Sequence, residues 1–289
     1  MNALIPTIWA AGGLLLFLAA ANFFLPRKLD YAGNLPKLTP ILRQIFVVHS
    51  VFIVILLLGF SAACFLFAPD LAGGSALGRL VSGFIGVFWL LRAAIQRFYY
   101  DPELRRQHRA ADIGFTWLFL FFGGLFTFAA VAGPRLAETT PALVAYNQWE
   151  RLFDIALWLA GAGHFIVLIA SFQVPSRLGW RQDFAQLKRF NQKLVWTYSG
   201  YIVLTILAFG ILTLCLHDEF LRGDRSALGL AAFMGVFWSI RVTLDFACFG
   251  HDDWPRGFRF VIAHVLLTLL LIALAGTYLG LLVWRLGKG

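Results

Sequence analysis

Eight long runs of apolar residues, separated by short polar segments, dominate the hydrophobic pattern of the chain. Each run has about 20 or more residues, the length at which an α-helix crosses a hydrocarbon core about 30 Å thick. The runs are continuous rather than alternating, which favours helices over the strands of a barrel. The pattern predicts an all-α fold, a polytopic transmembrane helical bundle. The predicted spans are residues 4–25, 44–67, 80–99, 112–133, 152–172, 194–216, 227–248 and 258–284.

Prolines between the apolar runs predict where the helices end, because the residue before a proline avoids the helical conformation. Pro26 follows the first run, Pro102 the third and Pro175 the fifth. No polar tract between the runs is long enough to form a soluble domain. The whole chain is therefore predicted to belong to the membrane bundle.

The chain repeats itself at an offset of 149 residues. Residues 84–92 (FIGVFWLLR) match residues 233–241 (FMGVFWSIR) at six of nine positions. The same offset aligns Pro26 with Pro175. A single register that holds over several spans predicts an internal duplication of a four-helix unit.

The duplication predicts two domains, residues 1–140 and 141–289, with four spans each. The fourth spans align weakly, so that part of the repeat is inferred. Because four is an even number, both halves enter the membrane in the same direction. The repeats are therefore expected to be parallel, a 4+4 arrangement related by an axis along the membrane normal.

Composition and charge support a membrane protein with a defined orientation. The chain is 60% hydrophobic and only 13% charged, with a net charge of +9. Of its 24 basic residues, 15 lie at the span ends and loops after the first, third, fifth and seventh spans, and seven lie on the opposite side. The positive-inside rule predicts cytoplasmic basic loops and both termini outside, in a plasma membrane such as a bacterial inner membrane. No basic patch or motif indicates nucleic acid; membrane lipids are the expected partners.

Two arginines stand at matching positions inside predicted spans. Placing Arg92 or Arg241 near the middle of a span costs about 2.5–3.5 kcal/mol, so each is expected to face the bundle interior and to have a partner. Asp245 lies one helical turn after Arg241 and predicts an ion pair. Gln96 holds the equivalent place after Arg92, which leaves Arg92 without a counter-ion on its own helix. Its partner is expected from another helix, from a ligand, or from lipid headgroups that the long side chain reaches by snorkelling.

Trp89 and Trp238 lie three residues before the two arginines, on the same helical face. Each indole is predicted either to stack on the guanidinium or to pack in the core. With the arginines, Gln96 and Asp245, they form the candidate ligand-binding residues. An anionic small molecule or lipid headgroup at the interface of the two repeats is the ligand that this pattern indicates.

Other polar residues within the predicted spans are His49, Tyr198, His164 and His264. Tyr198 is the repeat partner of His49, so the two halves supply no symmetric pair of histidines for a haem. No histidine spacing typical of haem or metal binding occurs. We therefore predict no cofactor and no metal site, and expect the histidines to serve mainly in packing.

Three functional hypotheses remain open at this point. The favoured one is a binding or transport module for an anionic ligand. The first alternative is a membrane-embedded enzyme or redox protein that acts on a lipid through its histidines. The second is a structural or accessory subunit. No nucleotide-binding, metalloprotease or nucleophile motif is found, and no catalytic residue is identified. The sequence therefore favours a role other than catalysis and leaves the enzymatic hypothesis open.

Overall fold

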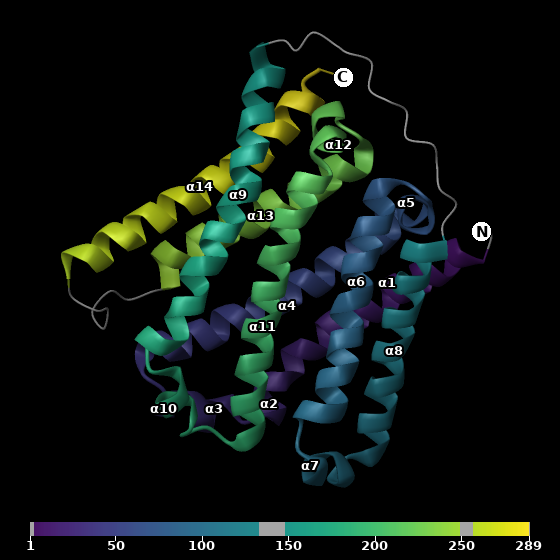
Figure 1. Ribbon diagram of the computed structural model, residues 1–289. Helices are drawn as coiled ribbons and strands as arrows, with labels where there is room; N and C mark the ends of the chain where they lie inside the picture. Colours follow the sequence, from purple (N-terminus) through teal and green to yellow (C-terminus); the bar gives the residue numbers. More distant parts are fainter. Residues whose placement is uncertain (1–2, 133–147, 249–256, 289) are drawn as a thin grey trace. The chain divides into compact units, whose positions relative to one another are not determined.

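The protein, seen here in a computed structural model, is helical over almost all of its described residues (Figure 1). The structure describes residues 3–132, 148–248 and 257–288. Within these ranges no strand occurs, and eight helices are long and apolar enough to cross a membrane, which confirms the predicted all-α fold with eight spans. The spanning helices are α1 (Leu4–Ala21, extended by η1, Asn22–Phe24, and α2, Leu25–Lys28), α4 (Pro40–Leu66), α6 (Ala76–Ala94, extended by η3, Ile95–Tyr99), α8 (Arg109–Ala132), α9 (Gln148–Arg177), α11 (Arg189–Cys215), α13 (Arg225–Cys248) and α14 (Phe258–Leu286). The shorter helices are α3 (Tyr31–Asn34), η2 (Leu35–Lys37), α5 (Ala68–Ala72), α7 (Pro102–Gln107), α10 (Trp180–Phe184) and α12 (His217–Arg222).

Many large apolar side chains on the long helices are exposed. Phe17, Val131 and Phe172 are exposed by 68%, 77% and 68%. So many exposed large apolar side chains would be costly in water, whereas lipid tails solvate them. The long helices therefore belong to an integral membrane protein.

Several helices begin about one turn before the predicted spans. α4 starts at Pro40 rather than at residue 44, and α9 starts at Gln148 rather than at residue 152. Hydropathy marks only the stretch that suits hydrocarbon, whereas a helix, once formed, gains one hydrogen bond for each residue added. Pro175, a predicted helix end, lies inside α9, which continues to Arg177 before it stops.

The chain forms two compact units. Among the described residues, unit 1 comprises 3–37, 49–132 and 184–204, and unit 2 comprises 38–48, 148–183, 205–248 and 257–288. The first part of α11 thus belongs to unit 1, and the start of α4 belongs to unit 2. The predicted domains, which divide the chain near residue 140, stay a prediction.

Small residues allow two pairs of helices in unit 1 to approach closely. A Cβ at Gly12 on α1 would lie 2.9 Å from the Cβ of Cys64 on α4, and the Ser61 hydroxyl donates to the Gly12 carbonyl at 2.9 Å. A Cβ at Gly86 on α6 would lie 2.9 Å from the backbone nitrogen of Thr127 on α8. Only glycine fits these crossings without a shift of the helices.

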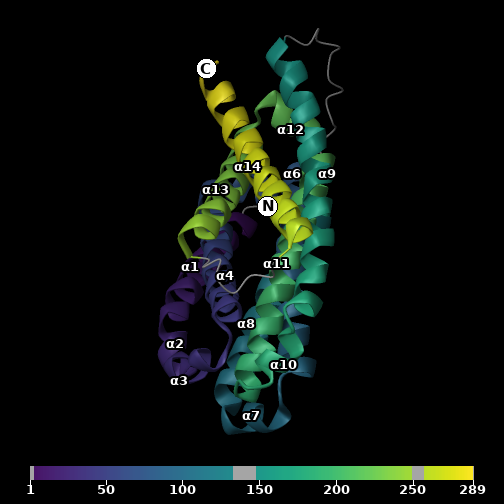
Figure 2. The same ribbon diagram turned by 90° about the vertical axis from the view of Figure 1, so that its left-hand side faces the viewer.

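Unit 2 has close approaches at corresponding positions. Gly161 on α9 faces Leu214 on α11, and a Cβ at Gly235 on α13 would lie 2.7 Å from Leu279 on α14. Gly161 and Gly235 come 149 residues after the two glycines of unit 1. α14 packs against both α13 and α9 (Figure 2). The duplication itself stays a prediction.

A left-handed residue turns the chain at the end of α2. Asp30 has φ 51°, the one positive φ of a residue other than glycine in the described ranges. Aspartate tolerates this conformation better than most residues because its short side chain can bond locally. Its carboxylate accepts a hydrogen bond from the Gly33 backbone nitrogen (3.2 Å) and pairs with Lys188 Nζ (2.8 Å), and the lysine lowers the pKa of Asp30.

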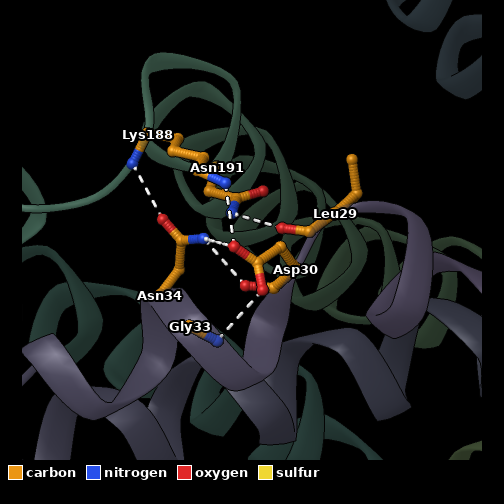
Figure 3. Close-up of polar contacts among 6 residues, drawn as sticks. All are labelled: Leu29, Asp30, Gly33, Asn34, Lys188 and Asn191. Atoms are coloured by element: carbon orange, nitrogen blue, oxygen red, sulfur yellow. Dashed lines mark hydrogen bonds and ion pairs between the residues drawn. The ribbon is translucent and has the colours of Figure 1, made fainter.

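Two further contacts tie this turn to the residues at and just before the start of α11 (Figure 3). The fully buried Asn34 donates to the Asp30 carbonyl at 2.7 Å and accepts from the Lys188 backbone nitrogen at 3.1 Å. Asn191 donates to the Leu29 carbonyl at 3.0 Å. We call this set of contacts the polar clamp. It joins residues about 150 apart in the sequence within unit 1.

Candidate functional site

The polar cluster around Arg92, at the end of α6, is the candidate site of unit 1. The guanidinium of Arg92 lies 4.7 Å from the ring centre of Phe119 and 5.4 Å from that of Tyr100. Its Nη1 donates to Gln96 Oε1 (3.2 Å), and Gln96 Nε2 donates to Asp112 Oδ1 (2.7 Å). The amide therefore separates the guanidinium from the carboxylate. No carboxylate in the described part of the chain forms an ion pair with Arg92.

A π-helical turn, η3, brings Tyr100 into this cluster. The Tyr100 backbone nitrogen donates to the Ile95 carbonyl five residues earlier, at 3.3 Å. Tyr100 is buried, with its ring stacked on Phe190 (5.2 Å) and its hydroxyl 3.4 Å from Thr197 Oγ1. π-Helical turns insert a residue into a helix and occur frequently at functional sites. Here the turn supplies one of the two rings that face the guanidinium of Arg92.

A lysine on α11 closes the end of the π-helical turn. Lys193 Nζ donates to the Tyr99 carbonyl (2.7 Å) and pairs with Asp101 (2.8 Å). The bond from Lys193 lowers the pKa of Asp101, so this carboxylate stays ionised at neutral pH. The charge of Lys193 is therefore compensated, in contrast to that of Arg92.

Buried hydroxyl groups extend the cluster in unit 1. Tyr31 shares hydrogen bonds with Ser50 and Tyr198, and burial raises the pKa of Tyr31 to about 12. Tyr198 and Tyr201 lie close enough to Arg92 to interact with its charge. A neutral phenol can donate a hydrogen bond to an anion as well as accept one.

Trp89 packs against the same aromatic group and does not stack on the guanidinium. Its ring stacks on Phe119 (5.3 Å) and contacts Phe122 (4.7 Å). Of the two arrangements predicted for this tryptophan, core packing is the one present. Its buried Nε1 has no hydrogen-bond partner among the described residues.

The corresponding arginine of unit 2 has its counter-ion, as its spacing predicts. Arg241 Nη1 lies 2.9 Å from Asp245 Oδ1, and the aspartate side chain is only 6% exposed. Asp245 Oδ2 also accepts from Thr268 Oγ1 (3.3 Å) and lies 3.6 Å from His264 Nε2. Both oxygens of this carboxylate are therefore engaged.

The histidines named from the sequence each have polar contacts within their own unit. His49 Nδ1 lies 3.4 Å from Ser199 Oγ in unit 1, and His264 contacts Asp245 in unit 2. Among the described residues, no group of three or more His, Cys, Asp or Glu side chains is arranged to hold a metal ion.

His164 is fully buried and uses both ring nitrogens. Trp238 Nε1 can only donate, so His164 Nε2 accepts from it at 3.1 Å. The proton must then sit on Nδ1, which donates to the Ala160 carbonyl at 2.7 Å. No ring nitrogen of His164 remains for a ligand or for proton transfer.

This bond predicts a difference between Trp238 and Trp89, the two tryptophans that the predicted repeat aligns. We expect Trp238→Phe to destabilise the protein by about 1–3 kcal/mol more than Trp89→Phe, because only the former leaves a buried histidine nitrogen without its donor. Thermal unfolding of both variants in the same detergent measures the difference. Equal losses would show that the bond between Trp238 and His164 contributes nothing.

Of the predicted set, unit 1 contains Arg92, Gln96, Trp89, Tyr198 and His49, and unit 2 contains Arg241, Asp245, Trp238, His164 and His264. Sequence reasoning missed Tyr100 and Phe119 as partners of Arg92, and Tyr31 as a partner of Tyr198. Tyr100 follows directly after the third predicted span, residues 80–99, and was not among the candidate residues. The π-helical turn that redirects it has no recognisable sequence signal.

Comparison with models of protein families, with curated proteins and with solved structures finds no match.

Proposed function

We propose that this integral membrane protein binds a small anionic molecule or an anionic lipid headgroup at Arg92 in unit 1. The observation that carries the proposal is the contrast between the two arginines. Arg241 has an ion pair with Asp245, whereas Arg92 has Gln96 at the equivalent position. A ligand with a negative charge would supply what Asp245 supplies in unit 2.

The surroundings of Arg92 suit such a ligand. The faces of Phe119 and Tyr100 hold the cation without neutralising it. Gln96 uses its oxygen on Arg92 and its nitrogen on Asp112, which fixes the guanidinium in place. A guanidinium has five N–H donors in a planar fork, and among the described residues only Gln96 accepts from that of Arg92, through one of them. The remaining donors fit the oxygens of a carboxylate or phosphate.

The duplication belongs to the same proposal. The close approaches at Gly12 and Gly86 recur 149 residues later at Gly161 and Gly235, which supports equivalent helix packing in two parallel repeats. Transport of the ligand across the plasma membrane, with cytoplasmic basic loops and both termini outside, is the larger role that we infer. The shared interface of the two arginines stays a prediction.

The experiment compares Arg92→Gln with Arg241→Gln, the same change in the other unit. The protein is released from native-lipid nanodiscs and weighed by native mass spectrometry. We expect an anionic ligand to be retained by the wild type and by Arg241→Gln. Affinity in Arg92→Gln should fall about 10–100-fold, the value of one or two charge-assisted hydrogen bonds.

Loss of the ligand from both variants to the same extent would contradict a site at Arg92. An absorption spectrum of the same sample tests the redox alternative, since a Soret band would indicate haem bound through histidine. A well-folded wild type that carries no anion, and takes none up when lipids are added, would favour the structural role instead.

A further inference from the structure

The two arginine sites differ in the side chains that stand at matching positions around the arginine. Gln96 and Asp245 both follow their arginine by four residues. On the neighbouring helix of each unit, Asp112 and His264 lie 152 residues apart. Thr127 and Leu279, which face the close-packed glycines of α6 and α13, have the same spacing. Unit 1 therefore combines arginine, amide and acid, whereas unit 2 combines arginine, acid and histidine.

These differences change where the negative charge lies relative to the arginine. In unit 2 the carboxylate of Asp245 touches the guanidinium of Arg241 directly, at 2.9 Å. In unit 1 the carboxylate of Asp112 is one amide away from Arg92. The guanidinium of Arg92 thus lacks a carboxylate in the place where Arg241 has one.

We propose that the ligand of unit 1 carries a single carboxylate group, and that Asp245 is a built-in substitute that keeps the equivalent site of unit 2 closed. This inference rests on the proposed function. One guanidinium without an ion pair balances one negative charge, so a monoanion fits better than a dianionic phosphate. The planar fork of arginine matches the two oxygens of a carboxylate.

The side chains around Arg92 indicate the polarity of the part of the ligand beyond its carboxylate. Phe119 and Tyr100 present ring faces to Arg92, and Phe122 and Trp89 pack behind Phe119. These rings are buried, and the exposed residues that precede Arg92 on α6, Leu90 and Leu91, are also apolar, which favours an apolar tail next to the carboxylate. The chemical class is a monocarboxylic amphiphile, of which a long-chain fatty acid is the simplest example.

Removing the substitute carboxylate should open the second site. We expect wild-type protein in nanodiscs to bind one oleate per chain, and Asp245→Gln, which gives unit 2 the amide of unit 1, to bind two. The double variant Arg241→Gln/Asp245→Gln should return to one. Native mass spectrometry counts the bound molecules, and thermal unfolding shows that each variant is folded. Asp245→Asn, which keeps the shape of the side chain, replaces Asp245→Gln if the longer side chain prevents folding.

Competition experiments on the wild type alone test the ligand class. Dioleoyl phosphatidic acid should not displace oleate from Arg92. Acetate, which has a carboxylate but no long apolar tail, tests the contribution of the tail. Acetate that binds much more weakly than oleate supports an amphiphile, whereas acetate that binds as tightly as oleate overturns the apolar tail.

A folded Asp245→Gln or Asp245→Asn variant that still binds one oleate would overturn the role of Asp245. If phosphatidic acid binds at Arg92 and oleate does not, the proposed function stands and the carboxylate inference fails. If the wild type binds no anion and Arg92→Gln changes nothing, the proposed function itself fails.

Discussion

Gly86→Val is expected to force α6 and α8 apart and to lower the stability of unit 1 by about 1–3 kcal/mol or more. A Cβ at this position would lie 2.6 Å from the Thr127 hydroxyl oxygen and 2.9 Å from the Thr127 backbone nitrogen. The hydroxyl can rotate away, but the backbone nitrogen cannot move without the helix. Because α6 carries Arg92 and α8 carries Phe119, ligand binding should weaken as well. Thermal unfolding of purified protein measures the first effect.

Gly124→Val is the matched control on the partner helix α8. Apart from its chain neighbours and the nearby backbone of its own helix, no described atom lies within 4 Å of a Cβ placed at Gly124, so the same change meets open space and should cost little. Gly235→Val in unit 2 should fall between them, since the nearest atom belongs to the flexible Leu279 side chain. Similar losses in Gly86→Val and Gly124→Val would show that the close approach at Gly86 is unimportant.

Gln96→Asp is expected to close the site of unit 1. A carboxylate at position 96 would follow Arg92 by four residues, as Asp245 follows Arg241. Asp245 Oδ1 lies 2.9 Å from Arg241 Nη1. The new ion pair would compete with the ligand for the guanidinium. Affinity for the anion should therefore fall about 10–100-fold, the value of a charge-assisted hydrogen bond. Titration of the ligand into nanodiscs measures the change.

Gln96→Asn separates charge from size in this experiment. Asparagine has the length of aspartate but no charge, so it shortens the side chain and leaves Arg92 without an ion pair. We expect it to retain most of the binding. If asparagine and aspartate weaken binding equally, the contact between Gln96 and Asp112 matters and the charge on residue 96 does not.

The eight spans could be predicted because the bilayer imposes a single length and a single polarity on each of them. The ends of the helices were predicted less accurately, because hydropathy does not detect the polar helical turns that precede an apolar stretch. Gln148 begins α9 although it is polar, and Pro175 does not end it. At both places the hydrogen bonds of the helix outweigh a local preference.

The candidate site was predictable only where its residues share a helix. The spacing of Arg241 and Asp245 gave their ion pair, and the lack of a counter-ion next to Arg92 was visible for the same reason. Contacts between helices were not visible. Phe119 reaches Arg92 from α8, and Trp238 finds His164 on α9, 74 residues earlier in the chain. Such pairs depend on how the helices pack, which a single sequence does not specify.

The polar clamp constrains the order in which the protein can be assembled. Lys188 and Asn191 complete unit 1, yet a ribosome translates them only after all of the first four spans. Until the sixth span enters the bilayer, the side-chain oxygen of the buried Asn34 and the Leu29 carbonyl lack the partners that Lys188 and Asn191 supply. The first four spans must therefore be inserted in the membrane before the contacts of unit 1 are complete. Its final packing becomes a post-insertion event rather than a step completed during synthesis.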